Sequence, residues 1–152
     1  MTTIINGVAG AKALVGQVLG SSDWVTIDQD RINQFADVTG DHQWIHVDVE
    51  RAKAGPFGAP IAHGFLTLSM VVALNQQIVR YEGFTAGINY GLNKVRFLTP
   101  VKVGSRVRST LTMQSIEDKP MGILITNAAV IEIEGAPKPA CTIEQLSLMI
   151  PA

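Results

Sequence analysis

The side chains best suited to chemistry stand close together between Phe35 and His46, in a segment rich in acidic and imidazole groups. Asp41 follows directly after Gly40, and His42 and His46 are its nearest imidazoles along the chain. A carboxylate and an imidazole held by one short loop can serve as a general acid/base pair. The spacing alone fits two uses equally well: catalysis by Asp41 and His46, or a loop in which Asp41 only accepts backbone hydrogen bonds and His46 only packs.

A helix is expected to present this loop. Apolar residues recur at the i, i+3, i+4 spacing of an amphipathic helix between about residues 27 and 39. The segment Thr26–Gln29 fits the S/T-x-x-E/Q capping box that marks a helix start. Gly40 suits the left-handed position that ends such a helix, so Asp41 is expected just beyond its end.

A second helix is predicted from His63 to about Val79, after a segment from 47 to 62 whose glycines and prolines are typical of a loop. Between Phe65 and Leu74, apolar residues cover nearly the whole circumference of this helix. A helix that is apolar all round is expected to be buried all round. In a chain of this size, such burial requires a sheet curled around the helix.

The second half of the chain supplies that sheet. Four stretches alternate apolar and polar residues with the period of a strand, namely 85–98, 105–116, 121–134 and 139–150. Gly91, inside the first of them, predicts a bulge or a close backbone approach. Residues 8–19 are expected to form a short opening helix. One buried helix and an antiparallel meander indicate an α+β fold, and the absence of repeats and linkers predicts one domain over residues 1–152.

The composition limits the class of protein. The 152 residues are 47% hydrophobic and only 16% charged, which predicts a substantial core and extra apolar surface for a subunit interface. The net charge of −1 argues against a nucleic-acid partner. Asn6 and Lys12 interrupt the first apolar run, so no signal peptide is expected, and the run Gly64–Leu74 is too short to span a membrane. The single Cys141 has no partner for an internal disulfide. A soluble, cytoplasmic protein is the expectation.

This layout and the Gly-Asp…Ile-His pattern together resemble the MaoC-like dehydratases, the R-specific enoyl-CoA hydratases of the hot-dog fold, over about residues 20–150. The family signature has an aromatic residue before Gly-Asp, an aliphatic residue before His, and a small residue after them. The matching residues here are Phe35, Thr39, Gly40, Asp41, Ile45, His46 and Ala52. Further landmarks are Ala62-His63-Gly64, Val95-Arg96-Phe97, Pro100-Val101 and Gly104. The run Ile88–Phe97 is most similar to the nodulation-protein-N branch of the family.

The chain departs from the family pattern at two places. Gln43-Trp44 stands where the family has Asn-Pro, so this loop must turn without the fixed φ of proline. Val72 stands where some hydratases have a serine, so no substrate contact made by that serine is carried over.

The resemblance implies that the chain hydrates 2-enoyl-CoA thioesters and needs no cofactor. Asp41 would be the general base on water, and His46 would be its partner. The Gly64 N–H, at the start of the buried helix, would bind the thioester oxygen. Gln43 would hold the loop or touch the substrate.

Two further imidazoles are expected outside the reaction: His63 bonding backbone at the helix entry, and His42 exposed on the other side of the loop. A metal site made of His42, His46 and His63 is disfavoured, because no close second carboxylate or cysteine completes it. Arg96 and Arg106 lie in a basic stretch without acidic residues and are hypothesised to meet the phosphates of coenzyme A. A solvated strand face is the alternative for each arginine.

The resemblance also implies a homodimer or a higher oligomer of dimers, because pairing covers the open edges of a hot-dog sheet. Two alternatives for the activity remain. A hot-dog acyl-CoA thioesterase would direct a carboxylate and water at the thioester carbon, and the Gly-Asp…Ile-His pair speaks against it. A non-catalytic acyl-thioester-binding accessory protein is favoured only by the replacement at Gln43-Trp44.

Overall fold

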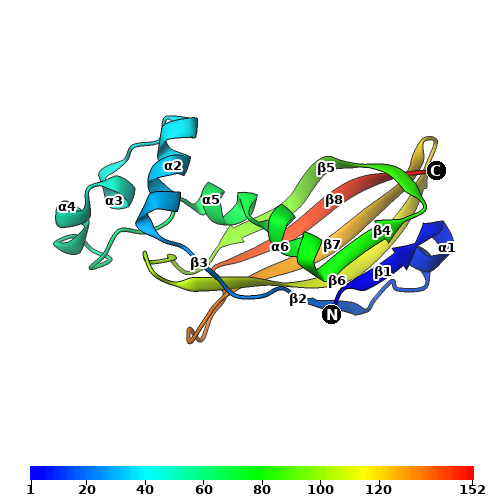
Figure 1. Cartoon of the computed structure of the whole chain (residues 1–152), viewed down its shortest axis with the longest axis horizontal. Helices are drawn as coiled ribbons and strands as arrows, with labels where there is room; N and C mark the ends of the chain where they lie inside the picture. The colour runs from blue at the N-terminus through cyan, green and yellow to red at the C-terminus, as the bar shows by residue number, and fades with distance from the viewer.

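A long, curved antiparallel sheet forms the body of the computed structural model, which describes residues 1–152 (Figure 1). Its strands are β2 (Val18–Ser21), β3 (Val25–Thr26), β5 (Phe84–Phe97), β6 (Arg106–Lys119), β7 (Gly122–Ile133) and β8 (Cys141–Pro151). Their order is β2-β6-β7-β8-β5, and β3 also pairs with β6. The four long strands confirm the four stretches predicted from alternation. The predicted bulge is also present, because the pairing of β5 with β8 shifts register between Asn89 and Gly91.

The concave face of this sheet is apolar over most of its area and carries the core. Val107, Leu111 and Met113 of β6 point inward, and so do Ile125 and Ile131 of β7. They belong to one buried cluster that also contains residues from the central helix and from the helix before Asp41. The alternation of apolar and polar residues therefore arises because one face of each strand packs on the core and the other face points outward.

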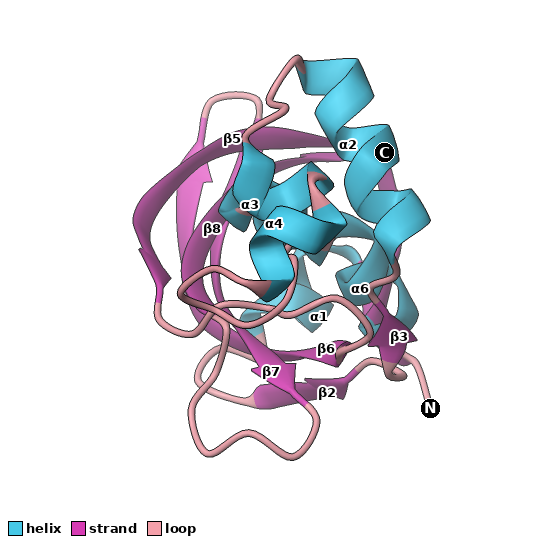
Figure 2. Ribbon diagram, turned by 90° about the vertical axis from the view of Figure 1, so that its left-hand side faces the viewer, coloured by secondary structure: helices cyan, strands magenta, loops and turns pink.

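The central helix lies inside the curve of the sheet, as the view in Figure 2 shows. It is divided into α5 (Gly64–Ser69) and α6 (Val71–Ile78), with Met70 between them. Leu74 and Ile78 are buried against the sheet, but Phe65 is 67% exposed and Val72 is 40% exposed. The prediction of burial all round is therefore wrong. The sheet covers only one side of the helix, and the side next to the edge strand β5 has no layer over it.

The N-terminus adds a small second sheet beyond the end of the central helix. β1 (Thr3–Asn6) pairs in parallel with β4 (Val79–Glu82), and α1 (Gly7–Lys12) follows β1 directly. The opening helix predicted over 8–19 is therefore shorter than expected, since the chain turns after α1 and enters β2.

Three helices gather at the opposite end of the molecule, on the left of Figure 1. They are α2 (Gln29–Thr39), α3 (Trp44–Val47) and α4 (Val49–Lys53). The predicted end of α2 is confirmed, because Gly40 has φ 81° in the left-handed region. Its predicted start is wrong by two residues: the N-cap is Asp28, whose carboxylate accepts from the Arg31 N–H, and not Thr26.

The loop predicted over 47–62 is also partly wrong. Its first residues continue α3 and then form α4, which Asp48 caps by accepting a hydrogen bond from the Arg51 N–H. Only the part after Lys53, which contains the glycines and prolines, lacks helices and strands apart from an isolated bridge at Ile61. None of the helices in the structure combines the length and the hydrophobicity that a membrane-crossing helix requires.

Candidate active site

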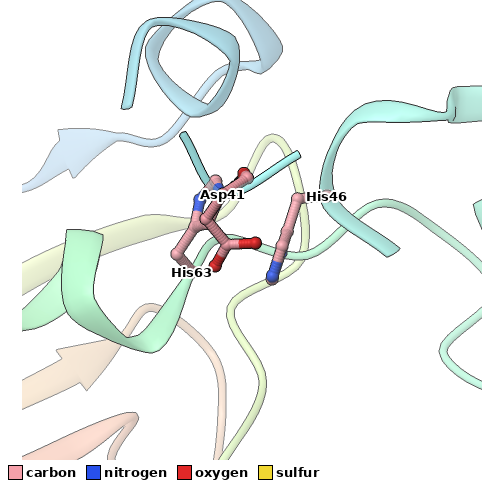
Figure 3. Close-up of side chains that lie close together, drawn as sticks. All are labelled: Asp41, His46 and His63. Atoms are coloured by element: carbon pink, nitrogen blue, oxygen red, sulfur yellow. The ribbon is translucent and has the colours of Figure 1, made fainter. Parts of the chain in front are cut away.

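Asp41, His46 and His63 meet where the three-helix end joins the central helix (Figure 3). One potential ligand atom from each of the three side chains lies within 4.8 Å of the other two. Asp41 follows the end of α2, His46 lies in α3, and His63 is the residue before α5. Three separate segments therefore have to be held in register for this group to exist.

Hydrogen bonds between these segments provide that register. The Ile61 N–H donates to the Ile45 carbonyl oxygen at 3.0 Å, and His46 donates back to the Ile61 carbonyl oxygen at 2.6 Å. Gln29, in the first turn of α2, donates to the His46 carbonyl oxygen at 2.9 Å. The segment before α5 is also tied to the sheet, because the Ala62 N–H donates to the Val101 carbonyl oxygen at 2.8 Å.

His46 is buried, and its hydrogen bonds fix its tautomer. The Ile61 carbonyl oxygen can only accept, so Nδ1 of His46 carries the proton and Nε2 keeps a free lone pair in the neutral ring. Burial is the main cause that lowers the pKa of His46 below its ordinary value, and nearby His63 lowers it further. The Ile61 hydrogen bond and the Asp41 charge oppose this shift. His46 is therefore a hydrogen-bond acceptor at Nε2 near neutral pH.

Asp41 is exposed and sits where the chain leaves α2. Its carboxylate accepts the Gln43 N–H at 3.3 Å, which closes a short turn immediately after Gly40. Figure 3 shows the carboxylate beside the His46 ring. A carboxylate next to a neutral imidazole acceptor offers two acceptors to the two hydrogens of one water molecule.

His63 has a larger part in the site than the sequence predicted. It does bond backbone at the helix entry, since Nε2 donates to the Asp41 carbonyl oxygen at 2.9 Å. Its ring also stacks on the His46 ring, with the two ring centroids 3.9 Å apart. The centroid of the Phe35 ring lies 4.9 Å from the centroid of the His63 ring. His63 thus touches both members of the Asp41–His46 pair. The sequence marked His63 only through the family landmark Ala62-His63-Gly64. Its contacts with Asp41 and His46 join distant parts of the chain, and no local sequence pattern predicts them.

These three residues do not form a good metal site. The His46 and His63 rings are stacked at 23° to one another, so the lone pairs of their nitrogens run side by side and do not converge on one ion. Zinc needs its nitrogen ligands about 2.0–2.1 Å away in a tetrahedral arrangement. The metal site of His42, His46 and His63 considered from the sequence is not formed either. His42 is exposed, and its Nε2 lies 3.0 Å from Asp37. That contact is the main cause that raises the pKa of His42 above its usual value.

Gly64 is the first residue of α5, and its N–H has no partner among the hydrogen bonds of the protein. It lines a hollow of about 340 Å³ together with Thr67, Phe97 and Val101, and the Asp41, His46 and His63 side chains do not line this hollow. A Cβ at this position would lie 3.1 Å from the Phe97 ring. A side chain at this position would therefore push the Phe97 ring aside by a few tenths of an ångström, and the lack of one leaves the N–H open to a ligand.

The loop between Asp41 and His46 holds its shape without the proline of the family pattern. Gln43 contributes backbone only: its N–H bonds Asp41, its carbonyl oxygen accepts the His46 N–H at 3.0 Å, and its side chain forms no hydrogen bond. Trp44 packs on Gly55, where a Cβ would lie 2.9 Å from the indole, and the Arg51 guanidinium lies 4.2 Å from the ring centroid. Packing of Trp44 thus replaces the restriction that proline would give.

The two arginines hypothesised to meet phosphates have different surroundings. Arg106 already forms an ion pair with Glu134 at 2.9 Å, so its charge is partly neutralised. Arg96 is exposed and has no acidic partner, and its Nη1 donates only to the Val95 carbonyl oxygen. Arg96 lies on the opposite face of β5 from Phe97, the residue that contacts Gly64. Neither guanidinium forms a hydrogen bond with Asp41 or His46.

Comparison with known proteins adds independent information. The family of MaoC-like domains matches residues 11–133. The 3-hydroxyacyl-thioester dehydratase Z of Mycobacterium tuberculosis is 54% identical over 140 residues, which cover 91% of this chain and 93% of that protein. Nodulation protein N of Rhizobium leguminosarum bv. viciae is 44% identical over 145 residues, which cover 93% of this chain and 90% of the relative. The solved R-hydratase PhaJ1 of Pseudomonas aeruginosa superposes with a TM-score of 0.74 at 25% identity, covering 91% and 83% of the two chains. The hot-dog fold predicted from the sequence is confirmed.

Proposed function

This chain belongs to the MaoC-like domain family, and from that premise we propose that it is an (R)-specific enoyl-CoA hydratase, a hydro-lyase in which residues 1–152 act as one hot-dog domain. It adds water across the double bond of a trans-2-enoyl thioester, and in reverse it dehydrates an (R)-3-hydroxyacyl thioester. The names of the dehydratase and R-hydratase relatives support this reaction class. The observation that carries it is the Asp41 carboxylate beside a His46 ring whose tautomer leaves Nε2 free to accept.

The proposed reaction uses one water held between these two acceptors. The water donates one hydrogen to the Asp41 carboxylate and the other to Nε2 of His46. Asp41 takes its proton as the oxygen attacks the β-carbon, and the π electrons move to the α-carbon and the thioester oxygen. The same proton then returns to the α-carbon, so a hydroxyl and a hydrogen have been added and Asp41 is again a carboxylate. A positioned acid/base group of this kind typically contributes ~10²–10⁴ in rate.

The negative charge on the thioester oxygen needs a donor, and Gly64 is the proposed one. Its N–H is unpaired, and Gly64 lines the hollow of about 340 Å³ and follows His63 in the chain, so a carbonyl oxygen placed there can accept from this N–H. A backbone donor fixed before the reaction stabilises charge that develops only in the transition state. His63 is proposed as a positioning residue, because it holds the Asp41 backbone and stacks on His46 without needing to touch the substrate.

Purified protein with crotonyl-CoA tests this function directly. Loss of the enoyl absorbance and release of free thiol are followed in parallel in the same reaction. We expect absorbance to fall without thiol release, and no metal or cofactor is added. Thiol release would instead establish a thioesterase. No change in absorbance or in free thiol, with crotonyl-CoA or with enoyl-CoA substrates of longer chains, would establish a non-catalytic binding protein.

The pH dependence should follow His46. Because its pKa is lowered from 6.5, neutral His46 should persist below that pH, and activity should fall only when further acidification protonates Nε2 and removes its acceptor. We therefore expect the acid limb of kcat/KM to have its midpoint below pH 6.5. The matched control is His42→Gln, which removes an exposed imidazole with a raised pKa and should leave the profile unchanged. A midpoint above pH 6.5 would contradict the assigned state of His46.

A homodimer is proposed from the surface beside β5. This edge strand pairs only with β8 and exposes Tyr90 and Phe97. Phe97 packs edge-on against the exposed Phe65 of the central helix, and Tyr90 lies further along the same helix, by Leu68 and Val72. Exposed edges and apolar patches of this kind are normally covered. Sedimentation equilibrium should give twice the chain mass of 16.3 kDa. Tyr90→Glu should weaken the dimer by roughly 2 kcal/mol or more, whereas Val18→Glu on the opposite edge strand β2 should not. A monomeric wild type would contradict the proposal.

Arg96 is the proposed contact for the phosphates of coenzyme A, since it has no acidic partner whereas Arg106 pairs with Glu134. Arg96→Glu should raise KM for the CoA thioester and leave kcat unchanged. The variant Arg106→Glu, with Glu134 unchanged, should raise KM less than Arg96→Glu does. Unchanged kinetics in Arg96→Glu would remove this residue from the site.

A further inference from the structure

A hollow of about 390 Å³ lies between α6 and the strands β5 and β8, and the reaction proposed above does not use it. Neither Asp41 nor His46 lines this hollow. Its polar lining includes Asn75, Asn127, Gln145 and Ser147. The rest of the concave face of the sheet is mainly apolar, so this concentration of amides needs a physical reason.

Asn127 is the clearest case. It takes an inward position on β7 between Ile125 and Ala129, and it is only 5% exposed. Its Oδ1 is buried and has no hydrogen-bond partner in the protein, although the rest of its amide lies against the Tyr81 hydroxyl, which lines the same hollow. Burying an unpaired acceptor costs stability, so such groups are rare unless a ligand or water completes them.

The polar groups near Asn127 differ from it, because some of their hydrogen-bonding atoms pair with one another. Asn75 accepts from the Ser109 hydroxyl at 2.7 Å and donates to Oε1 of Gln145 at 3.2 Å. Because its Oε1 faces Asn75, Gln145 keeps its Nε2 donor free where it lines the hollow. Ser147 lines the same hollow, and its hydroxyl forms no hydrogen bond in the protein. The hollow thus offers an acceptor, a donor and a hydroxyl without partners.

This hollow is in line with the candidate active site. Three separate hollows lie one after another along the central helix and β5: the one at Gly64, a second of about 310 Å³ at Leu68 and Val72, and the polar one at Val72 and Asn75. The first and the second share no lining residue. The second and third share Val72 and Gln145 among their lining residues. At 1.5 Å per residue, Asn75 lies roughly 16 Å along the helix from Gly64. An acyl chain whose thioester oxygen is bound at Gly64 and which extends along this row of hollows ends among the amides.

We propose that the polar hollow binds a hydroxyl group near the far end of the acyl chain, so that the preferred substrates are medium- or long-chain enoyl thioesters with an oxygenated tail. The proposal rests on the hydratase function. A hydroxyl matches the site because it can donate to Oδ1 of Asn127 and accept from Nε2 of Gln145 at the same time. A plain alkyl end displaces water from these groups and leaves them unpaired, which typically lowers binding about ten- to a hundredfold.

The test compares pairs of trans-2-enoyl-CoA substrates of equal length, with and without a terminal hydroxyl, over medium and long chains. Wild type should show a kcat/KM about ten- to a hundredfold higher for the hydroxylated member at the length that reaches the hollow. Asn127→Leu, which has nearly the same shape, should abolish or reverse this preference. Thr126→Val, on the same strand but the opposite face, should keep it.

The outcomes separate the two proposals. Hydration of crotonyl-CoA with no preference within any long-chain pair would overturn the polar-tail proposal, leave the hydratase function intact and indicate that water alone fills the hollow. A preference that survives Asn127→Leu would overturn the role of Asn127. No hydration of any substrate, crotonyl-CoA included, would overturn both. Because the wild-type comparison needs no variant, a failure of Asn127→Leu to fold does not remove the test.

Discussion

Asp41→Asn is expected to lower kcat/KM for hydration of crotonyl-CoA by roughly 10²–10⁴, the usual contribution of a positioned general base. The amide has the same shape as the carboxylate, and its oxygen can still accept the Gln43 N–H that closes the turn after Gly40. It has almost no basicity, so it cannot take the proton of the attacking water. The loss should therefore lie in kcat, measured from the fall in enoyl absorbance, with thermal melting unchanged.

The matched control for this variant is Asp37→Asn. Asp37 is another carboxylate of the same segment, but it faces solvent and pairs with His42 instead of His46. Its replacement should leave hydration unaffected. The companion His46→Gln should cause a loss of similar size, and the double variant should lose little more than either single one, because the two residues act on one water. Asp41→Asn with more than about a tenth of wild-type activity would contradict the role of Asp41 as base.

The pair behind this prediction could be found from the sequence because its members are five residues apart and follow a helix end with a clear signal. Gly40 has the left-handed conformation that its position predicted, and the turn after it is local. His63 could not be placed in the same way. Its contacts with Asp41 and His46 depend on how α3 and the segment before α5 are clamped together by backbone hydrogen bonds, and no local spacing encodes that arrangement.

The same distinction holds for the fold. The four long strands were predicted well, since the alternation of inward and outward side chains is a property of each strand by itself. The helices α3 and α4 were missed because four or five residues are too few to show a helical period. The burial of the central helix was overestimated for a different reason. The apolar side of the helix that carries Phe65 and Val72 faces the edge of the sheet, and no other part of the chain covers it.

The second large effect is expected at Gly64, where proline can remove the N–H with little harm to the helix. Gly64 is the first helical residue, the position at which proline is best tolerated. His63 before it has φ −57° and ψ 139°, an extended conformation compatible with a following proline. Gly64→Pro should therefore keep α5 while removing the proposed oxyanion donor. We expect kcat to fall by roughly 10²–10³ relative to Gly64→Ala.

Gly64→Ala is the reference because both variants place a Cβ 3.1 Å from the Phe97 ring, whereas only alanine keeps the N–H. Any loss in Gly64→Ala relative to wild type measures crowding against Phe97, and the further loss in Gly64→Pro measures the missing donor. Melting temperatures of the two variants should agree, which separates the loss of the donor from unfolding. If the two variants hydrate crotonyl-CoA at equal rates, Gly64 is needed only for the close approach of Phe97 and the thioester oxygen is stabilised by another group.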